Sequence, residues 1–289
     1  MENLCYACPR NCGADRSVSV GACKVKNEFV IARAEKHFWE EPCISGQNGS
    51  GTIFFSGCNL GCVFCQNKEI SAYPKGKTVS RERLLEIFNE LKEKGAHNIN
   101  LVTPSHYTSA LKELLSASPL PIVWNSSAYE KVDSLALLDG LVQVYLPDFK
   151  FGTSECAKKY ASAPDYPEIA KKAIKEMFRQ RGPCKLENGM LLSGVLIRHL
   201  VLPENLESTY KVIDWVADNF APGEVLFSLM SQYTPLPNLP FEELTRPINK
   251  KEYILARNYM LKKGIKNGFV QELSSAKQEY TPPFDLSGV

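Results

Sequence analysis

The chain has 289 residues, of which 44% are hydrophobic and 23% are charged, a balance typical of globular proteins with one large core or two smaller ones. Its formal net charge of +2 is too small to indicate binding to nucleic acid or to a membrane surface. The first ten residues lack a basic and then apolar signal region, and no run of about 18 apolar residues occurs, so we expect a cytoplasmic protein.

The cysteines are too few for a disulfide scaffold and are unevenly placed along the chain. There are ten in all, and eight of them fall in the first 65 residues. In a reducing compartment, clustered cysteines are more often metal ligands or catalytic groups than disulfide partners. We therefore divide the chain into a small cysteine-rich lobe, residues 1–45, which is a candidate metal-binding region, and a larger domain, residues 46–289.

Apolar runs alternate with amphipathic segments from residue 52 onward. The first predicted strand is "TIFFSG" (52–57), and the first predicted helix spans residues 80–94, with Ser80 as its N-cap and Gly95 as its stop. Further strands are predicted at 98–102, 120–124, 141–146, 194–202 and 224–230, and further helices at 106–117, 167–181, 206–219 and 250–263. This alternation indicates parallel βα units, in either a partial barrel or an open doubly wound sheet.

Polar side chains follow the first four predicted strands. They are Cys58, then Thr103 and Ser105, then Asn125 and Ser126, and finally Asp148 and Lys150. In parallel α/β folds the chemistry takes place at the carboxyl ends of the strands. We therefore expect the functional site to be built from these residues.

Three of the cysteines lie together directly after the first predicted strand, in "GTIFFSGCNLGCVFCQN" (51–67). Their spacing is Cys58-x3-Cys62-x2-Cys65, and thiolates are soft ligands that suit iron–sulfur clusters and zinc. A structural zinc site normally has four protein ligands, and no fourth cysteine or histidine follows nearby. The spacing predicts a [4Fe–4S] cluster with one iron open to a non-protein ligand. The alternatives are a zinc site with a remote fourth ligand and three buried cysteines.

A second group of cysteines lies at the amino terminus. Cys5-x2-Cys8-x3-Cys12, followed by Cys23, supplies four thiolates, enough for a tetrahedral zinc ion or a second iron–sulfur cluster. Cys43 is a substitute ligand. Such a centre would either relay electrons or brace the small lobe, and the sequence leaves both roles open.

The three-cysteine spacing, with the aromatic Phe64 before the last cysteine, resembles the signature of the radical S-adenosylmethionine (SAM) superfamily. The segment is also similar to that of glycyl-radical-enzyme activating enzymes, such as the pyruvate formate-lyase activating enzyme. "CYACPRNCGADR", "WEEPCISG" and "VTPSHY" resemble a related branch, and the likeness covers about residues 5 to 235.

This resemblance implies a partial (β/α)6 barrel in which the methionine moiety of SAM binds the open iron. The reduced cluster then cleaves SAM to methionine and a 5′-deoxyadenosyl radical, which abstracts hydrogen from a substrate. A one-electron donor such as flavodoxin or ferredoxin is implied as a partner. No protein residue is assigned a catalytic role, because the cofactors carry the chemistry.

The resemblance also implies which residues hold SAM. Phe64 would lie against the adenine, largely through its backbone. Thr103 and Ser105 stand where the activating enzymes have an acidic motif that receives the amino group, so the contact here lacks a carboxylate. Ser105 is also a candidate helix N-cap.

Residues after the later strands complete the predicted SAM site. Asn125 and Ser126 would reach the ribose or the carboxylate, and Asp148 and Lys150 resemble an Asp-x-Lys element of the activating enzymes. Arg198 is a further candidate partner for the carboxylate, which arginine binds through two hydrogen bonds. The structural alternatives are a helix cap for Asn125 and a surface ion pair of little energetic value for Asp148 with Lys150.

Three hypotheses of function remain open at this point. The first is an enzyme that abstracts hydrogen from a residue of a partner protein, as in glycyl radical activation. The second is a radical SAM enzyme that modifies a peptide or a small molecule. The third is a non-enzymatic zinc-binding module.

Overall fold

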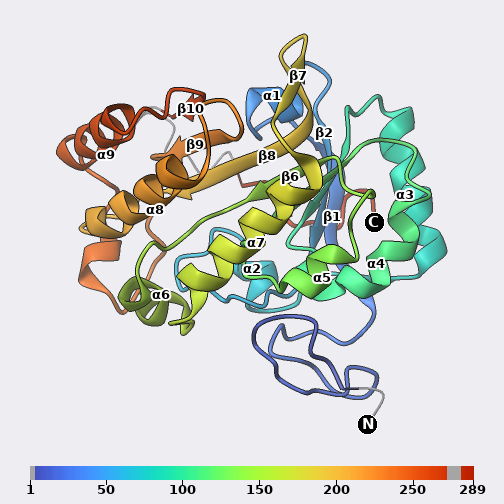
Figure 1. Cartoon of the computed structure of the whole chain (residues 1–289). Helices are drawn as coiled ribbons and strands as arrows, with labels where there is room; N and C mark the ends of the chain where they lie inside the picture. The colour runs from blue at the N-terminus through green and yellow to red at the C-terminus, as the bar shows by residue number, and fades with distance from the viewer. Residues whose placement is uncertain (1–3, 272–280) are drawn as a thin grey trace.

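A ten-stranded sheet forms the centre of the computed structural model, which describes residues 4–271 and 281–289 (Figure 1). The strand order is β10-β9-β8-β6-β5-β4-β2-β1-β3, and β7 pairs with β8. All neighbours from β2 to β9 in this order are parallel. The six predicted strands are therefore confirmed as the successive parallel strands of a partial barrel.

The strands are β1 Phe29–His37, β2 Ser50–Phe55, β3 Lys77–Val79, β4 Ile99–Val102, β5 Ile122–Ser126, β6 Val144–Pro147, β7 Lys185–Glu187, β8 Met190–Leu200, β9 Leu226–Met230 and β10 Gly268–Val270. The helices are α1 Pro42–Ser45, α2 Lys68–Ser71, α3 Arg81–Glu93, α4 Thr108–Leu115, α5 Val132–Ala136, α6 Ser154–Ala161, α7 Tyr166–Arg181, α8 Leu206–Asn219 and α9 Lys250–Lys262. Two short 3-10 turns lie at Ser105–Tyr107 and Glu242–Thr245.

The predicted helix boundaries follow from local chemistry. Ser80 caps α3, because its hydroxyl accepts a hydrogen bond of 3.2 Å from the backbone amide of Arg83. Gly95, in the left-handed region at φ +77°, lets the chain turn away after α3. α8 begins and ends at the predicted residues, and α7 begins one residue earlier than predicted, with a proline in its first turn.

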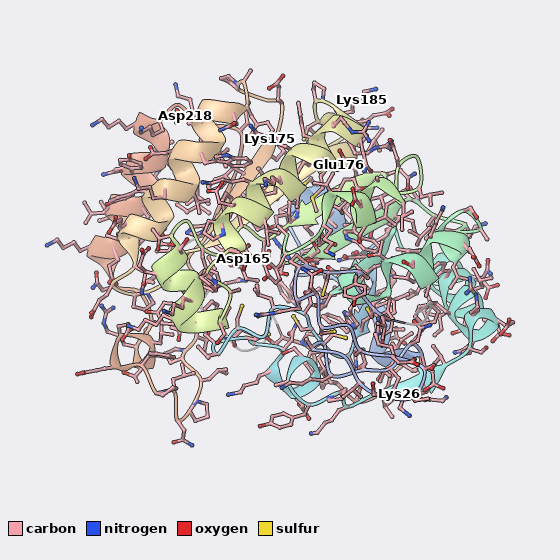
Figure 2. All side chains as sticks on the ribbon, turned by 60° about the horizontal axis from the view of Figure 1, so that its bottom comes forward. Lys26, Asp165, Lys175, Glu176, Lys185 and Asp218 are labelled. Carbon is pink, nitrogen blue, oxygen red and sulfur yellow. The ribbon has the colours of Figure 1, made fainter. Side chains whose placement is uncertain are left out.

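Helices cover the outside of the parallel strands and bury one face of each strand against them. β2, β4, β5, β6 and β9 are buried at every position, as expected of strands covered on both sides. α7 runs along the outside, with Lys175 and Glu176 on its length and Asp165 just before it (Figure 2). Within the described residues no helix is both long and apolar enough to cross a bilayer.

Strands outside the predicted set extend the sheet at both edges. β1 pairs antiparallel with β2 and β3, and β10 adds a parallel strand beside β9. β1 falls inside the predicted 1–45 lobe, so the described segment that lies outside the sheet is residues 4–28. Figure 1 shows this segment as loops at one end of the molecule, next to α2 and α5.

Candidate functional site

A cavity of about 250 Å³ lies at the carboxyl ends of the parallel strands. All three loop cysteines and seven of the eight predicted SAM contacts line it. They are Cys58, Cys62, Phe64, Cys65, Thr103, Asn125, Ser126, Asp148, Lys150 and Arg198. Parallel strands bring together residues that are up to 140 positions apart in the chain. The site thus stands where the fold predicts it.

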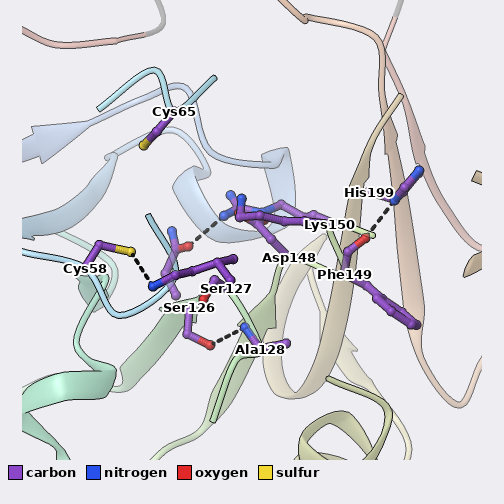
Figure 3. Close-up of polar contacts among 12 residues, drawn as sticks. Cys58, Cys65, Ser126, Ser127, Ala128, Asp148, Phe149, Lys150 and His199 are labelled. Atoms are coloured by element: carbon purple, nitrogen blue, oxygen red, sulfur yellow. Dashed lines mark hydrogen bonds and ion pairs between the residues drawn. The ribbon is translucent and has the colours of Figure 1, made fainter. Parts of the chain in front are cut away.

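The cysteine loop crosses the mouth of the barrel directly after β2, and all three of its thiols are free. The backbone amide of Leu60 and the hydroxyl of Ser71 each lie 3.4 Å from a sulfur, the first from Cys58 and the second from Cys65. Figure 3 shows Cys58 and Cys65 on the same side of Asp148 and Lys150, with the sulfur of Cys58 directed toward them. Donors aimed at sulfur stabilise thiolates, the form that binds metal.

The electrostatics of the loop also suit a bound metal centre. Burial raises the pKa values of Cys62 and Cys58, and the ammonium group of Lys150 opposes the rise at both. Buried thiols with raised pKa values stay neutral until a metal replaces their protons. Together with Cys65, which borders the same cavity, these thiols fit an iron–sulfur cluster, which takes each thiolate on a different iron.

Asp148 and its two cationic partners form the charged wall of the cavity. Its carboxylate accepts one hydrogen bond of 2.6 Å from Lys150 Nζ and another of 2.6 Å from Arg198 Nε. Burial alone would raise the pKa of Asp148, but the two cations outweigh it and lower that pKa. The pair predicted from sequence is half-buried and shared with a third residue, so it is not a surface ion pair.

Glu40 lies at the base of this wall and escaped the sequence analysis. Its carboxylate accepts hydrogen bonds from Arg198 at 2.7 Å, from Asn125 at 3.1 Å and from Asn100 at 3.0 Å. Arg198 also donates to the Asn125 side chain at 2.6 Å. Glu40 follows β1, a strand that the sequence did not predict. The acidic pair in "WEEP", after a short apolar run, was the available signal.

Two of the predicted hydroxyl contacts serve the structure of the loop after β5. The hydroxyl of Ser126 donates to Glu130 at 2.5 Å and accepts from the amide of Ala128 at 3.2 Å. Burial raises the pKa of Glu130, and hydrogen bonds from Ser126, Trp124 and Ser105 oppose the rise. Ser126 still borders the cavity, whereas Ser105 is buried and is not among the residues that line it.

Thr103 is held in an unusual backbone conformation at the end of β4. Its φ is +60°, the left-handed region that a threonine rarely adopts, and its amide donates to the Asn125 carbonyl at 2.9 Å. Strain of this kind persists where the surroundings enforce it, and it is concentrated at functional sites. The hydroxyl-bearing residue predicted to receive the SAM amino group therefore lies at a strained strand end on the cavity wall.

The two buried histidines near the strand ends are structural. His106 lies 3.0 Å from the Ser56 carbonyl, and His199 lies 2.7 Å from the Phe149 carbonyl (Figure 3). Burial lowers their pKa values to about 3 and about 4, so both stay neutral near pH 7. Neither borders the cavity among the residues that line it.

The amino-terminal cysteines lie behind the cysteine loop, outside the barrel. The backbone amide of Cys58 donates to the Cys23 carbonyl at 3.2 Å. A β-carbon at Gly57 would stand 2.5 Å from the same carbonyl, so only glycine allows this approach. Cys43 packs in a separate apolar cluster with Cys184, away from this group. In the described residues no three cysteine, histidine or carboxylate side chains already form a site for a single ion.

The fold and the site define a partial parallel barrel with a three-thiol loop at the mouth of a strand-end cavity. Residues 52–216 match the family model of the radical SAM superfamily. The match covers more than half of the chain, and the chain therefore belongs to this superfamily. The part of the predicted resemblance that concerns the superfamily is confirmed.

Individual proteins are also similar to this chain. "Uncharacterized protein MJ0674" of Methanocaldococcus jannaschii is 34% identical over 245 residues, which span 80% of this chain and 66% of that protein. The crystal structure of Streptococcus suis SuiB superposes with a TM-score of 0.52 at 14% identity, over 78% of this chain and half of SuiB. Methylornithine synthase (PylB) gives a TM-score of 0.49 at 14% identity, over 76% of this chain and 70% of that one. The chain thus spans less than the full length of these proteins.

Proposed function

We propose that this protein is a radical SAM enzyme in which Cys58, Cys62 and Cys65 hold a [4Fe–4S] cluster. When bound and reduced, the cluster cleaves SAM to methionine and a 5′-deoxyadenosyl radical that takes a hydrogen atom from the substrate. One observation carries the proposal: the three free thiols share a single cavity with the strand-end groups predicted to bind SAM.

Lys150 and Thr103 are the residues that we assign to the methionine moiety. An ammonium group has three hydrogen-bond donors, and the one contact described for Lys150 Nζ is that to Asp148. Burial lowers the pKa of Lys150, and the carboxylate of Asp148 raises it. Cys62 and Cys65 lie close enough to raise it further. Lys150 is thus placed to bind a carboxylate beside the cluster, and Thr103 borders the same space.

Asn125 and Arg198 lie at the base of the site, next to Glu40. Their side chains bond to each other and to Glu40, so each is already oriented before SAM binds. Preorganised groups bind without the cost of ordering. We assign Asn125 and Ser126 to the ribose, and Arg198 to the positioning of Asp148 and Asn125.

Phe64 forms part of the wall that keeps water from the site. Its ring packs edge-on against Phe151, Tyr160 and Tyr233, with ring centroids 5.9 to 6.2 Å apart. Because the ring packs against these three aromatic side chains, the backbone of Phe64 is the part available to adenine. An apolar wall of this kind protects a reactive radical from side reactions.

For the substrate we propose a residue of a polypeptide, as in glycyl radical activation. The support is the resemblance of the cysteine loop to that of the activating enzymes. The cavity also reaches the surface beside Trp39, which is 58% exposed and offers an aromatic surface at the entrance. Flavodoxin or ferredoxin is the proposed electron donor, and a free peptide or a small molecule is the alternative substrate.

The test is SAM cleavage by the full chain, reconstituted with iron and sulfide without oxygen and reduced with dithionite. We expect 5′-deoxyadenosine by mass spectrometry, its loss in Cys62→Ser, and its retention in the control Cys184→Ser. A chain that holds its cluster and forms no 5′-deoxyadenosine would overturn the proposal, as would stoichiometric zinc in place of iron at the loop.

The substrate proposal has a separate test. Incubation with a candidate glycyl radical enzyme should give a protein-based radical in electron paramagnetic resonance, with a doublet that collapses when the glycine α-hydrogen is replaced by deuterium. If SAM is cleaved but no candidate protein gains a radical, the substrate is a peptide or a small molecule and glycyl radical activation is wrong.

A further inference from the structure

Residues 4–28 have neither regular secondary structure nor a sizeable apolar core of their own. The segment contains no helix or strand, and its buried apolar side chains are Cys8, Cys23 and Val25. A segment this small needs a disulfide, a metal or a partner surface to hold one conformation. All ten cysteines of the chain are free, so disulfides do not supply the cross-link.

The backbone brings the first and third of the amino-terminal cysteines together. The amide of Cys5 donates to the Ala14 carbonyl at 2.9 Å, and the amide of Gly13 donates back to the Cys5 carbonyl at 3.2 Å. This pairing folds the chain back on itself, so that Cys5 lies opposite the stretch that begins at Cys12.

The remaining two cysteines converge on the same place. A β-carbon at Gly21 would stand 3.5 Å from the Cys12 sulfur and 3.3 Å from the Cys23 sulfur, so both sulfurs lie against this glycine. The amide of Asn11 donates to the Cys8 carbonyl at 3.1 Å, so a turn joins Cys8 to the stretch that begins at Cys12, and Cys8 is buried as Cys23 is. All four cysteines therefore lie within one small region.

We propose that Cys5, Cys8, Cys12 and Cys23 bind a second metal centre through four thiolates. The centre is a thiophilic metal, supplied either as one zinc ion or as an iron–sulfur cluster. Cys12 is exposed and Cys5 half-buried, so rotation of these side chains closes the site without repacking a core. Four protein ligands leave no open position, so this centre does not bind SAM.

The second centre acts on the first through direct contacts. The Cys23 carbonyl accepts the hydrogen bond of the Cys58 amide at 3.2 Å. Arg10 lies between two of the four ligands in sequence and donates to the carbonyls of Asn59 and Leu60, each at 2.8 Å. A metal that orders residues 4–28 thus orders the back of the loop that carries Cys58.

The test uses the full chain with Cys58→Ser, Cys62→Ser and Cys65→Ser, purified without oxygen, so that the loop holds no cluster. We expect either about one zinc or about four irons with matching sulfide per chain, measured by elemental analysis. X-ray absorption at the metal edge should show sulfur ligands at about 2.3 Å. Adding Cys23→Ser should lower the metal content at least tenfold, and adding the control Cys184→Ser should leave it unchanged.

Two results would overturn the second centre. One is a chain that is folded by circular dichroism and holds neither metal. The other is a metal content that Cys23→Ser does not change. If the triple variant does not fold, the same comparison of Cys23→Ser with Cys184→Ser is made in the reconstituted parent chain, where the loss of one of two centres is expected. Because metal content is measured, the result does not depend on SAM cleavage.

Discussion

The two cysteine groups contain the same ligand atoms but differ in what surrounds them. The loop group, Cys58, Cys62 and Cys65, shares a cavity with the strand ends and with charged residues from several strands. The amino-terminal group lies in loops outside the barrel, and the surface it contacts includes the back of the cysteine loop. The difference teaches that thiolate spacing provides metal ligands, whereas the neighbouring strand ends decide whether a substrate can reach them.

The largest effect should come from removing one loop cysteine. Cys62→Ser leaves only two cluster ligands, so we expect 5′-deoxyadenosine formation to fall by at least about a hundredfold, measured by mass spectrometry after reduction. Cys12→Ser removes an amino-terminal ligand and should spare most of the activity per bound cluster. Equal losses in both variants would break the distinction between the two groups.

The next effect tests the charged wall that only the loop group possesses. Arg198→Met leaves Glu40 and Asp148 buried beside each other without their shared cation, and breaking such a buried pair typically costs about 3–5 kcal/mol. The free energy of unfolding in urea measures the loss. Arg179→Met, on the exposed ion pairs of α7, is the control and should change stability far less.

Acid should destabilise the barrel, because the barrel buries His199. Residues 4–28 contain no histidine, so they should not share this effect. Burial lowers the pKa of His199 from its ordinary value of about 6.5 to about 4, so the unfolded chain binds a proton between these pH values and the folded chain does not. The contribution of His199 is complete above pH 6.5 and falls by about 2 kcal/mol between pH 6.5 and 5.

Urea unfolding at pH 7 and pH 5, compared between the parent chain and His199→Gln, measures this contribution. The variant should show the smaller loss of stability on acidification. An identical loss in both chains would mean that His199 titrates normally in the folded state.

The smallest global effect should come from the contact between the two regions. Arg10→Met removes hydrogen bonds to the carbonyls of Asn59, Leu60, Ala161 and Ser162, which together should contribute about 1–2 kcal/mol. Amide hydrogen exchange should speed up in residues 4–28 and in the cluster loop, and it should stay unchanged in the sheet. Arg33→Met, in an ion pair at β1 away from this contact, is the control.

Much of the barrel was predictable because its signals are local. The helix cap at Ser80, the apolar runs of the parallel strands and the three-cysteine spacing each act within a few residues. Residues at the ends of those strands were therefore assigned to one site without knowledge of the structure. In these cases the parallel topology alone brings the distant strand ends to one site.

The rest depended on contacts between distant parts of the chain. β1 is a strand of mixed polarity whose partner β2 begins thirteen residues after β1 ends and whose other partner, β3, begins later still, so its sequence did not indicate a strand. Glu40 follows β1 and was missed with it. Ser105 was assigned to SAM because it follows a strand, whereas its hydroxyl is committed to Glu130, a residue 25 positions away. Local patterns do not reveal such partners.

The central claim is that the loop cluster keeps one iron open for SAM, and electron paramagnetic resonance tests it most directly. The measurement uses the dithionite-reduced chain with Cys23→Ser, so that the loop cluster is observed without a second centre. The account predicts that adding SAM shifts the g values of the reduced cluster, because the methionine moiety becomes a ligand. A spectrum that is unchanged at saturating SAM would contradict it.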